Sequence, residues 1–340
     1  MLKFVGDICL SDHDFDKGFG VGSKLEKGHN VFSKILKGKN EIWMGNMECV
    51  LSESSERTGY NNQCFRVSPK ILSFDNLIDC YSVANNHIME HGLIAYNETI
   101  EAITHCGKEY VGSNEKKTIV LTDGDKKIAI TSFSLRCDNT GFKTGYWYNP
   151  ELKELKCECD KYQDNVHLRV AYIHWGVEFV PYPYKEQQVL AHYLVDIGYD
   201  LIIGVHPHII QGFEIYKGKY IYYSIGNFVF NMSYPDTQIG LVVSYDCDKN
   251  KVFHEYVKID SSYSPALITE DKVPYDLRAS NRNVLIGKYP NIEQYARASS
   301  LFLNKYRKYH HMSIVKNFFK YDIVFFKGMF LTFIKNRFNK

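Results

Sequence analysis

The sequence lacks the features that mark membrane-spanning, repetitive or disordered chains. Its 340 residues contain no internal repeat, no low-complexity tract and no apolar run near the roughly 20 residues of a spanning helix. Charge is balanced, with 41 Lys and Arg against 39 Asp and Glu, so nothing argues for a nucleic-acid partner and we expect none. The composition, 45% hydrophobic and 24% charged, is that of a globular protein with one large or about two domains.

The sequence contains cysteines but no paired-cysteine motif. The nine cysteines include no C-x-x-C pair, and several lie in apolar runs such as the one around Cys80, where a thiol behaves as a small hydrophobe. The chain starts at Met1–Asp7 with a strand-like run rather than a signal-peptide pattern. We therefore expect reduced, buried cysteines and a cytoplasmic location.

Strand-like and helix-like segments alternate over roughly the first two thirds of the chain, which predicts α/β layers. Short apolar runs typical of strands lie at 2–5, 42–44, 80–84, 170–173 and 201–205. Amphipathic segments typical of helices lie at 93–105 and 185–197. Runs separated by short polar turns predict hairpins within 118–133, 209–224 and 241–259, so the sheets should be mixed. Irregular structure is expected at 136–165 and 260–290.

Each of the five predicted strands is followed by side chains that can bind a metal ion. They are Asp7, the segment Asn46-Met47-Glu48, the pair Asn86-His87, His174, and the pair His206 and His208. Sheets of α/β proteins bind ligands at the carboxyl ends of their strands. Any one of these residues could be a capping or core residue, but their recurrence at five strand ends favours one shared site.

The chemistry of this set favours divalent transition metals. Imidazole, carboxylate and amide oxygen together suit an ion such as Zn, Mn, Fe or Co. The set is too large for one four-coordinate ion. Two ions that share a carboxylate would use it, and such pairs hold a bridging hydroxide that attacks an ester or amide.

Six short motifs together resemble CapA-type capsule-biosynthesis (poly-γ-glutamate) proteins, which look like a branch of the calcineurin-like metallophosphoesterases. In order along the chain, they are Gly6-Asp7, Asn46-Met47-Glu48, Asn85-Asn86-His87, His174-Trp175-Gly176, Gly204-Val205-His206-Pro207-His208 and Gly226-Asn227-Phe228. The resemblance spans about residues 2–245. It implies a four-layer α/β/β/α metallophosphoesterase-like sandwich with mixed sheets. We expect this catalytic domain over residues 1–260, with an irregular connector and a C-terminal helical appendage over 261–340.

The resemblance also divides the ligand residues between two divalent ions, for which Mn, Fe and Zn are the candidates. The implied ligands are Asp7 and His208 at the first ion, and Asn86, His174 and His206 at the second. Asn46 or Glu48 would bridge the ions, and Glu48 is chemically better because a carboxylate can bind two cations. His87 resembles the catalytic histidine that protonates the leaving group or stabilises its developing negative charge.

Several positions depart from the pattern of the wider superfamily. Cys9 stands where a histidine usually follows the first aspartate, and Asn46 replaces the second aspartate. Cys9 is either a soft metal ligand or a buried thiol. Glu90, three residues after His87, either orients that histidine or is a solvated residue at a helix start. Asn227 is a further candidate near the site.

The expected function is that of a metal-dependent hydrolase in cell-envelope polymer metabolism. A hydroxide held by two metals would attack a phosphoester or a γ-glutamyl or other amide bond, so the expected substrate is a phosphoester or a polyglutamate or envelope polymer. The absence of the usual superfamily residues at positions occupied by Cys9 and Asn46 supports a second hypothesis. In it, the protein is a non-catalytic metal-binding scaffold or assembly partner of an envelope-polymer synthesis complex.

Residues 312–340 form a basic, aromatic-rich tail, with Asp322 as its one acidic residue. The chain as a whole is 15% aromatic, and part of that excess lies here. Such a tail is typical of an interfacial helix on an anionic membrane, which would place the protein at the inner face of the membrane. The alternatives are a helix docked on the domain or a dimer contact. We expect the preceding helix, 292–311, to pack on the core or on this tail.

Overall fold

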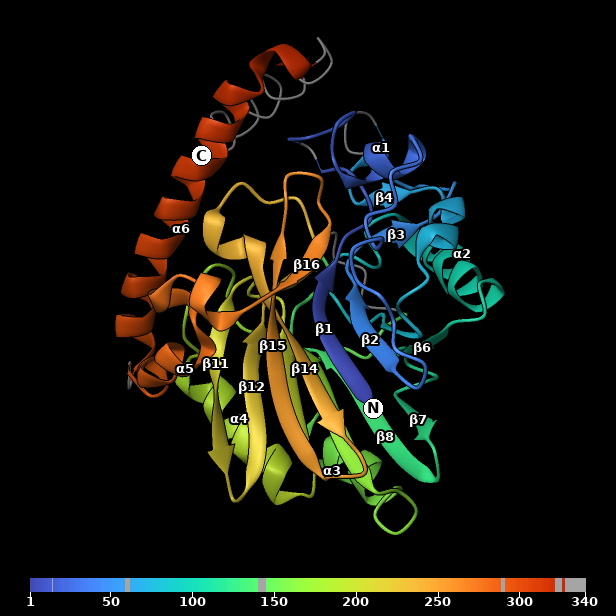
Figure 1. The fold of residues 1–340 in the computed structure, drawn as a ribbon, viewed down its shortest axis with the longest axis vertical. Helices are drawn as coiled ribbons and strands as arrows, with labels where there is room; N and C mark the ends of the chain where they lie inside the picture. Colours follow the sequence, from blue (N-terminus) through green and yellow to red (C-terminus); the bar gives the residue numbers. More distant parts are fainter. Residues whose placement is uncertain (14, 59–61, 140–144, 289–290, 322–325, 328–340) are drawn as a thin grey trace.

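Two mixed β-sheets lie face to face at the centre of the molecule (Figure 1). The computed structural model describes residues 1–340 except 14, 59–61, 140–144, 289–290, 322–325 and 328–340. The larger sheet has the order β16-β15-β14-β1-β2-β5-β6, and β13 also pairs with β1. Its strands are β1 (Leu2–Ile8), β2 (Ile42–Met47), β5 (Cys80–Ser82), β6 (Glu109–Val111), β13 (Asn227–Val229), β14 (Ile239–Asp246), β15 (Lys251–Ile259) and β16 (Pro265–Ile268).

The smaller sheet has six strands in the order β11-β12-β10-β9-β8-β7. Its members are β7 (Thr118–Asp123), β8 (Lys126–Ser134), β9 (Leu168–His174), β10 (Leu201–Val205), β11 (Ile210–Tyr216) and β12 (Lys219–Ile225). The central strands β8, β9, β10 and β12 run parallel, whereas the β7–β8 and β11–β12 pairs are antiparallel. A separate small ribbon pairs β3 (Val50–Leu51) with β4 (Arg66–Val67).

Helices cover the outer face of each sheet. The described α-helices are α1 (Val21–Glu26), α2 (Gly92–His105), α3 (Leu152–Asp160), α4 (Lys185–Asp196), α5 (Ala279–Arg282) and α6 (Ile292–Lys316). Short 3-10 turns are η2 (Pro69–Phe74), η3 (Pro235–Gln238), η4 (Glu270–Lys272), η5 (Tyr275–Leu277), η6 (Asn283–Leu285) and η7 (Phe318–Lys320).

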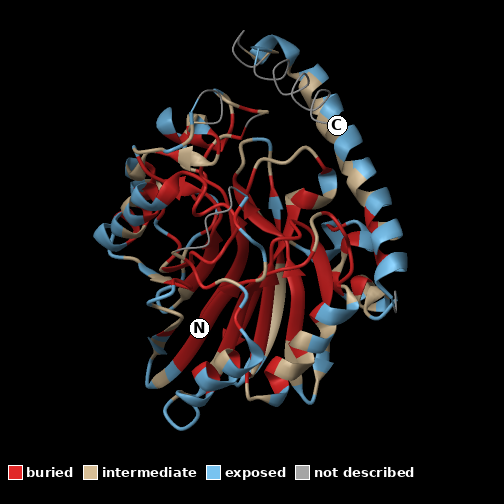
Figure 2. Cartoon of the chain, turned by 180° about the vertical axis from the view of Figure 1, so that it is seen from behind, coloured by how far each residue is buried: buried red, intermediate tan, exposed pale blue. Residues whose placement is uncertain are grey.

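Alternating side chains of each strand enter different apolar clusters, which divides the protein into four layers. Phe4 of β1 packs with Val170 of β9 between the two sheets, while the next residue, Val5, points to the outer face that α2 covers. Ala171 of β9 packs outward with Leu194 of α4. This is the period-two pattern of a strand buried on both faces. Figure 2 shows the buried residues concentrated on the strands and the exposed ones on the outer sides of the helices. The predicted α/β/β/α fold with mixed sheets is confirmed.

Two predictions of irregular structure were wrong in part. Residues 136–165 contain α3, which starts with a capping box between Glu151 and Glu154 and buries Leu155 and Cys159. Its short, mostly polar sequence hides the helical period, because only two apolar positions face the sheet. Residues 260–290 contain β16, so the larger sheet extends beyond residue 260. The cysteine prediction also failed at three positions, since Cys106, Cys137 and Cys157 are exposed.

The predicted C-terminal helix is present as α6, and it packs on the core. Tyr295 near its start lies edge-on against Tyr182, with ring centroids 5.5 Å apart. Figure 1 shows α6 along the outside of the molecule, from beside α5 towards the end that carries α1. Most of the predicted membrane-binding tail, 312–340, lies outside the described residues, so membrane contact stays a prediction. Within the described part of the chain, no helix is both long and apolar enough to cross a bilayer.

The close approach of β1 to the turn before β13 gives a first prediction. A methyl group on Gly6 would lie 1.7 Å from the carbonyl oxygen of Gly226, whereas one on Gly18 would meet nothing within 4 Å. We expect Gly6→Ala to lower the free energy of unfolding by about 3 kcal/mol, because the backbone at Gly226 would have to move away from β1. Gly18→Ala should cost only about 1 kcal/mol, from its positive φ of 90°. Urea unfolding measures both, and equal losses would contradict the prediction.

Candidate metal centre

The carboxyl ends of β1, β2, β9 and β10 bring the predicted ligands together. Strand register aligns Asp7 with Asn46 across β1 and β2, and Val205 with His174 across β9 and β10. The two sheets are linked at this end, because the Tyr172 hydroxyl donates a hydrogen bond to the Val5 carbonyl at 2.7 Å. The shared strand edge predicted from the sequence therefore exists, and the ligand-type residues of both sheets converge on it.

Glu48, just after β2, lies at the centre of this cluster. Its Oε1 atom is 3.7 Å from His174 Nε2, and 3.8 Å from both His87 Nε2 and His208 Nε2. The residue is fully buried, and Oε1 has no hydrogen-bond partner. Burial and the neighbouring Asp7 raise the pKa of the Glu48 carboxyl well above its usual value. A cation bound beside this carboxyl would favour its ionised form.

Three overlapping groups have ligand atoms within 4.8 Å of one another, as a bound cation requires. The groups are Asp7, Glu48 and His208; Glu48, His174 and His206; and Glu178, His206 and His208. Both ring nitrogens of the fully buried His206 also lack a hydrogen-bond partner. Unpartnered buried nitrogens and a buried carboxylate carry a large desolvation cost that a metal ion would remove. The residues present fit divalent metal ions.

Asp7 is held by both sheets. Its Oδ1 accepts a hydrogen bond from the Asn46 amide at 2.9 Å, and its Oδ2 accepts one from the His206 backbone at 3.0 Å. Burial opposes ionisation of Asp7, but the hydrogen bond and charge of His208 outweigh it, so the pKa of Asp7 is lowered. Asp7 correspondingly raises the pKa of His208 against the effect of burial. A divalent ion would compete with this proton for the His208 ring.

The remaining ligand imidazoles are neutral. Burial lowers the pKa of His174 and His206 well below the usual value, which leaves a lone pair on each ring. His174 Nε2 lies 2.7 Å from Asn86 Oδ1, so these two predicted ligands of one ion are adjacent. His174 Nδ1 is 3.3 Å from the Asn46 amide nitrogen. His174 is also close to His206, with ring centroids 4.5 Å apart, so it contacts both other side chains implied as the second ligand set.

The segment that carries His206 and His208 has an unusual backbone. Their φ angles are 95° and 59°, in the left-handed region that disfavours residues with a Cβ. The preceding Gly204 permits a close approach to β12, since a methyl there would lie 2.1 Å from the Tyr223 carbonyl oxygen. Such conformations persist where surrounding structure holds them, and here they direct both imidazoles towards the carboxylates.

His87 is fixed at the edge of the cluster. Its ring stacks on Phe65 with centroids 3.9 Å apart, and its Nδ1 is 2.7 Å from Glu90 Oε1. Glu90 is buried and pairs with Arg57, and it accepts a hydrogen bond from Asn139 at 2.9 Å. Burial opposes its ionisation, but the charge and hydrogen bond of His87, Asn139 and Arg57 hold the pKa of Glu90 at about 2. Of the two alternatives for Glu90, orientation of His87 is the one that the structure supports.

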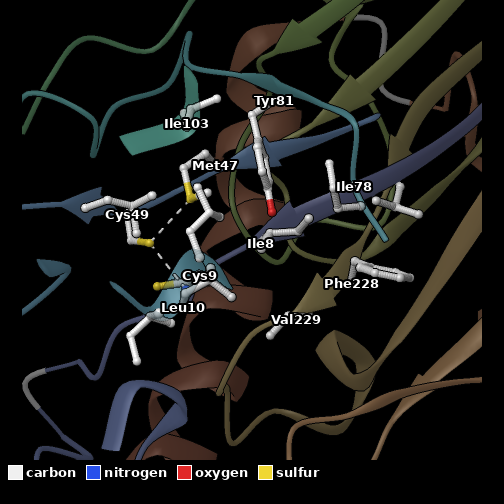
Figure 3. Packing of buried hydrophobic residues seen from close by; sticks show 14 of the residues in the cluster. Ile8, Cys9, Leu10, Met47, Cys49, Ile78, Tyr81, Ile103, Phe228 and Val229 are labelled. Carbon is white, nitrogen blue, oxygen red and sulfur yellow. Dashed lines mark hydrogen bonds between the residues drawn. The ribbon is translucent and has the colours of Figure 1, made fainter. Parts of the chain in front are cut away.

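The other secondary candidates have different positions. Cys9 lies in the apolar cluster beside Cys49 and Met47 (Figure 3), and burial raises the pKa of its thiol well above the usual value. It belongs to none of the candidate metal groups found among the described residues. Asn46 lies inside the centre and donates to Asp7. Asn227 contacts the centre indirectly, through its Oδ1 atom 2.9 Å from His208 Nδ1.

Sequence reasoning missed three supporting residues. Glu178 lies four residues after His174 and joins a candidate metal group, a spacing that a search for carboxylates near the His-Trp-Gly motif could have found. Asn85 donates to the Asn46 side chain at 3.1 Å and to the Met47 carbonyl at 2.7 Å. Arg57, which pairs with Glu90, belongs to none of the motifs and gave no signal.

Comparison with known proteins shows the family of this chain. The family model described as bacterial capsule synthesis protein PGA_cap matches residues 1–232. The chain is 33% identical to capsule biosynthesis protein CapA of Bacillus anthracis over 181 aligned residues. The aligned segment covers 50% of this chain and 44% of that protein. The chain is 31% identical over 203 residues to PGA biosynthesis protein CapA of Bacillus subtilis, covering 55% and 52%. The chain spans about half the length of these relatives. It belongs to the bacterial capsule synthesis protein family.

Solved structures that the fold is similar to include two enzymes. One is a phosphatase from Mycoplasma pneumoniae, with a TM-score of 0.45, 13% identity, and coverage of 77% of this chain and 95% of that one. The other is a putative 5'-nucleotidase from Staphylococcus aureus, with a TM-score of 0.44, 13% identity, and coverage of 84% and 58%.

The low pKa of Glu90 gives a second prediction. Its value of about 2, against an ordinary 4.5, means that the folded state favours the carboxylate. We expect Glu90→Gln to lower the free energy of unfolding at pH 7 by about 2–3 kcal/mol. A carboxyl group with a depressed pKa stabilises the folded state at pH values above the pKa that it has in the unfolded chain. This contribution is lost as the pH falls from about 4.5 to about 2. The difference between wild type and variant should therefore shrink over that range.

Urea unfolding at several pH values measures this difference. The matched control is Glu101→Gln, on the exposed side of α2, which should have little effect at any pH. A loss of stability in Glu90→Gln that stays constant from pH 7 to pH 3 would contradict the electrostatic explanation.

Proposed function

We propose that this member of the bacterial capsule synthesis family is a metal-dependent hydrolase that acts in capsule or cell-envelope polymer metabolism. The observation that carries the proposal is the buried Oε1 atom of Glu48, which has no hydrogen-bond partner and lies 3.7–3.8 Å from three imidazole nitrogens. A carboxylate in this position is suited to bind two cations. The hydrolysed bond would be a phosphoester or a γ-glutamyl or other amide bond.

The proposed ligands form two sets that share Glu48. Asp7 and His208 would complete one, and Asn86, His174 and His206 the other. Two divalent ions of Mn, Fe or Zn in these sets would polarise the bond under attack and lower the pKa of a bound water. Asn46 would act beside them, by holding Asp7 through its amide at 2.9 Å rather than by bridging the ions. This arrangement would compensate for the missing superfamily aspartate.

His87 is the proposed proton donor to the leaving group. Its Nδ1 lies 2.7 Å from Glu90 Oε1, and this contact orients the ring so that Nε2 is directed towards the centre, 3.8 Å from Glu48 Oε1. The stacked ring of Phe65 limits rotation of the imidazole. General acid catalysis of this kind contributes about 10²–10⁴-fold to a rate. The chain therefore offers both a place for metal ions and a positioned acid.

A third prediction concerns metal content. After reconstitution with Mn²⁺, we expect about two equivalents per chain by elemental analysis, because two ligand sets share one carboxylate. Glu48→Gln should weaken both sites by at least about tenfold, since an amide cannot supply the bridging charge. Glu101→Gln is the control and should retain the wild-type content. Absence of metal after reconstitution would favour the alternative, a non-catalytic scaffold of an envelope-polymer synthesis complex.

A fourth prediction concerns turnover. With Mn²⁺ present, bis(p-nitrophenyl) phosphate tests phosphoester cleavage and γ-glutamyl-p-nitroanilide tests amide cleavage. We expect His87→Ala to lower kcat on the cleaved substrate by about 100-fold or more while metal content stays unchanged. His105→Ala, at the exposed end of α2, should have wild-type activity. Undiminished turnover in His87→Ala would show that the role proposed for this residue is wrong.

A further inference from the structure

We propose that α6 forms one wall of the substrate pocket, and that this pocket holds a flat ring bonded to the group that is hydrolysed. The inference rests on the proposed function, because it takes the candidate metal centre as the place of reaction. It adds a substrate class and a segment of the chain that the motifs do not reach.

The pocket opens directly onto the metal centre. Its volume is about 240 Å³, and His87, Glu178 and His208 form its floor. Its walls are mainly aromatic: Phe15, Phe65, Phe179, Phe230 and Tyr306. Aromatic walls favour flat ligands, because stacked or edge-on rings gain about 0.5–1.5 kcal/mol beyond the burial of their area. A substrate ring bound in this pocket would lie next to the substrate bond that is positioned at the metal centre.

Helix α6 contributes to these walls from far along the chain. The Tyr306 ring is stacked on Phe179, with centroids 3.8 Å apart and an angle of 7° between the planes. Phe179 in turn lies 6.0 Å from the His208 ring. One turn further along α6, His310 lies edge-on to Phe15 at 4.9 Å. The helix is therefore in contact with residues that border the metal centre, and it is not a detached appendage.

The segment after α6 contacts the loop that carries Phe15. The Tyr321 hydroxyl donates a hydrogen bond to the Phe15 carbonyl at 2.6 Å. The Lys320 ammonium lies 5.1 Å from the Phe19 ring centroid, on the same loop. Both contacts bind the loop that carries Phe15 to the end of α6. A substitution in α6 should consequently alter the pocket without touching a proposed metal ligand.

The polar part of the lining is small. Among the described residues it consists of four histidines and one carboxylate, Glu178, without lysine or arginine. His13 is buried between the rings of Phe15 and Phe230, at 5.1 and 5.0 Å, and its Nε2 has no hydrogen-bond partner. It could make one polar contact with a bound ring.

This wall lies outside the part of the chain that the family shares. The family model ends at residue 232, and α6 begins at Ile292. The metal ligands lie within the shared region, whereas Tyr306 and His310 do not. Tyr306 would therefore add to the rings of Phe15, Phe65, Phe179 and Phe230, which lie within the matched region.

Binding calorimetry with two small phosphonates tests the inference without turnover. Phenylphosphonate and methylphosphonate present the same anion to the Mn²⁺-loaded protein, and they differ only in the ring. We expect phenylphosphonate to bind about three- to tenfold more tightly, from the stacking contribution of the aromatic walls. Tyr306→Ala should remove most of this preference, and Tyr306→Phe, which keeps the ring, should retain it.

The matched control is Lys308→Ala, two residues along α6 on its exposed side, which should bind both phosphonates like wild type. Equal binding of the two phosphonates to wild type, no binding of either, or an unchanged preference in Tyr306→Ala would overturn the inference. Urea unfolding of Tyr306→Ala checks that the fold is retained. A protein that prefers phenylphosphonate but cleaves no tested substrate would contradict the proposed hydrolase function and leave the pocket assignment standing.

Discussion

A carboxyl group that is fully buried, such as that of Glu48, must either stay protonated or find positive charge nearby. Its Oε1 atom faces three imidazoles without a hydrogen bond, and two of the histidines around the centre, His174 and His206, are held neutral by burial. The strained backbone at His206, the close contact of Gly6 with Gly226 and the Asn46 amide that holds Asp7 all serve this arrangement. A protein without a ligand here would gain stability from an apolar residue at position 48.

Much of the fold and most of the centre could be predicted from the sequence, because both follow local rules. Apolar runs define the strands, and parallel register aligns Asp7 with Asn46 in one sheet and His174 with Val205 in the other. Helix α3 was missed because its buried face has only two apolar side chains, Leu155 and Cys159, so no period is visible. The contact of Arg57 with Glu90 and that of Tyr306 with Phe179 depend on loops and on docking of a distant helix. No spacing in the sequence encodes such contacts.

The two sides of the site differ in how they are built. The floor comes from strand ends, which rigid sheets position, and its residues lie within the region matched by the family model. The walls come from several loops within the same region and from α6, which lies outside it, and rings of the two parts pack against one another. Chemistry placed on strands and recognition placed on loops and helices is a common division in enzymes. Such a division would let the same hydrolysis act on substrates that differ in the group next to the hydrolysed bond.

The hydrogen bond from the His206 backbone to Asp7 joins residues 199 positions apart in the chain. Ligands so distant cannot be collected by a partly synthesised or partly folded chain, because the loop between them must close before they meet. The N-terminal half alone, with Asp7, Glu48 and Asn86, would offer oxygen ligands but none of the three histidines that follow. Metal capture would thus come at the end of folding and would stabilise the completed sandwich over every intermediate.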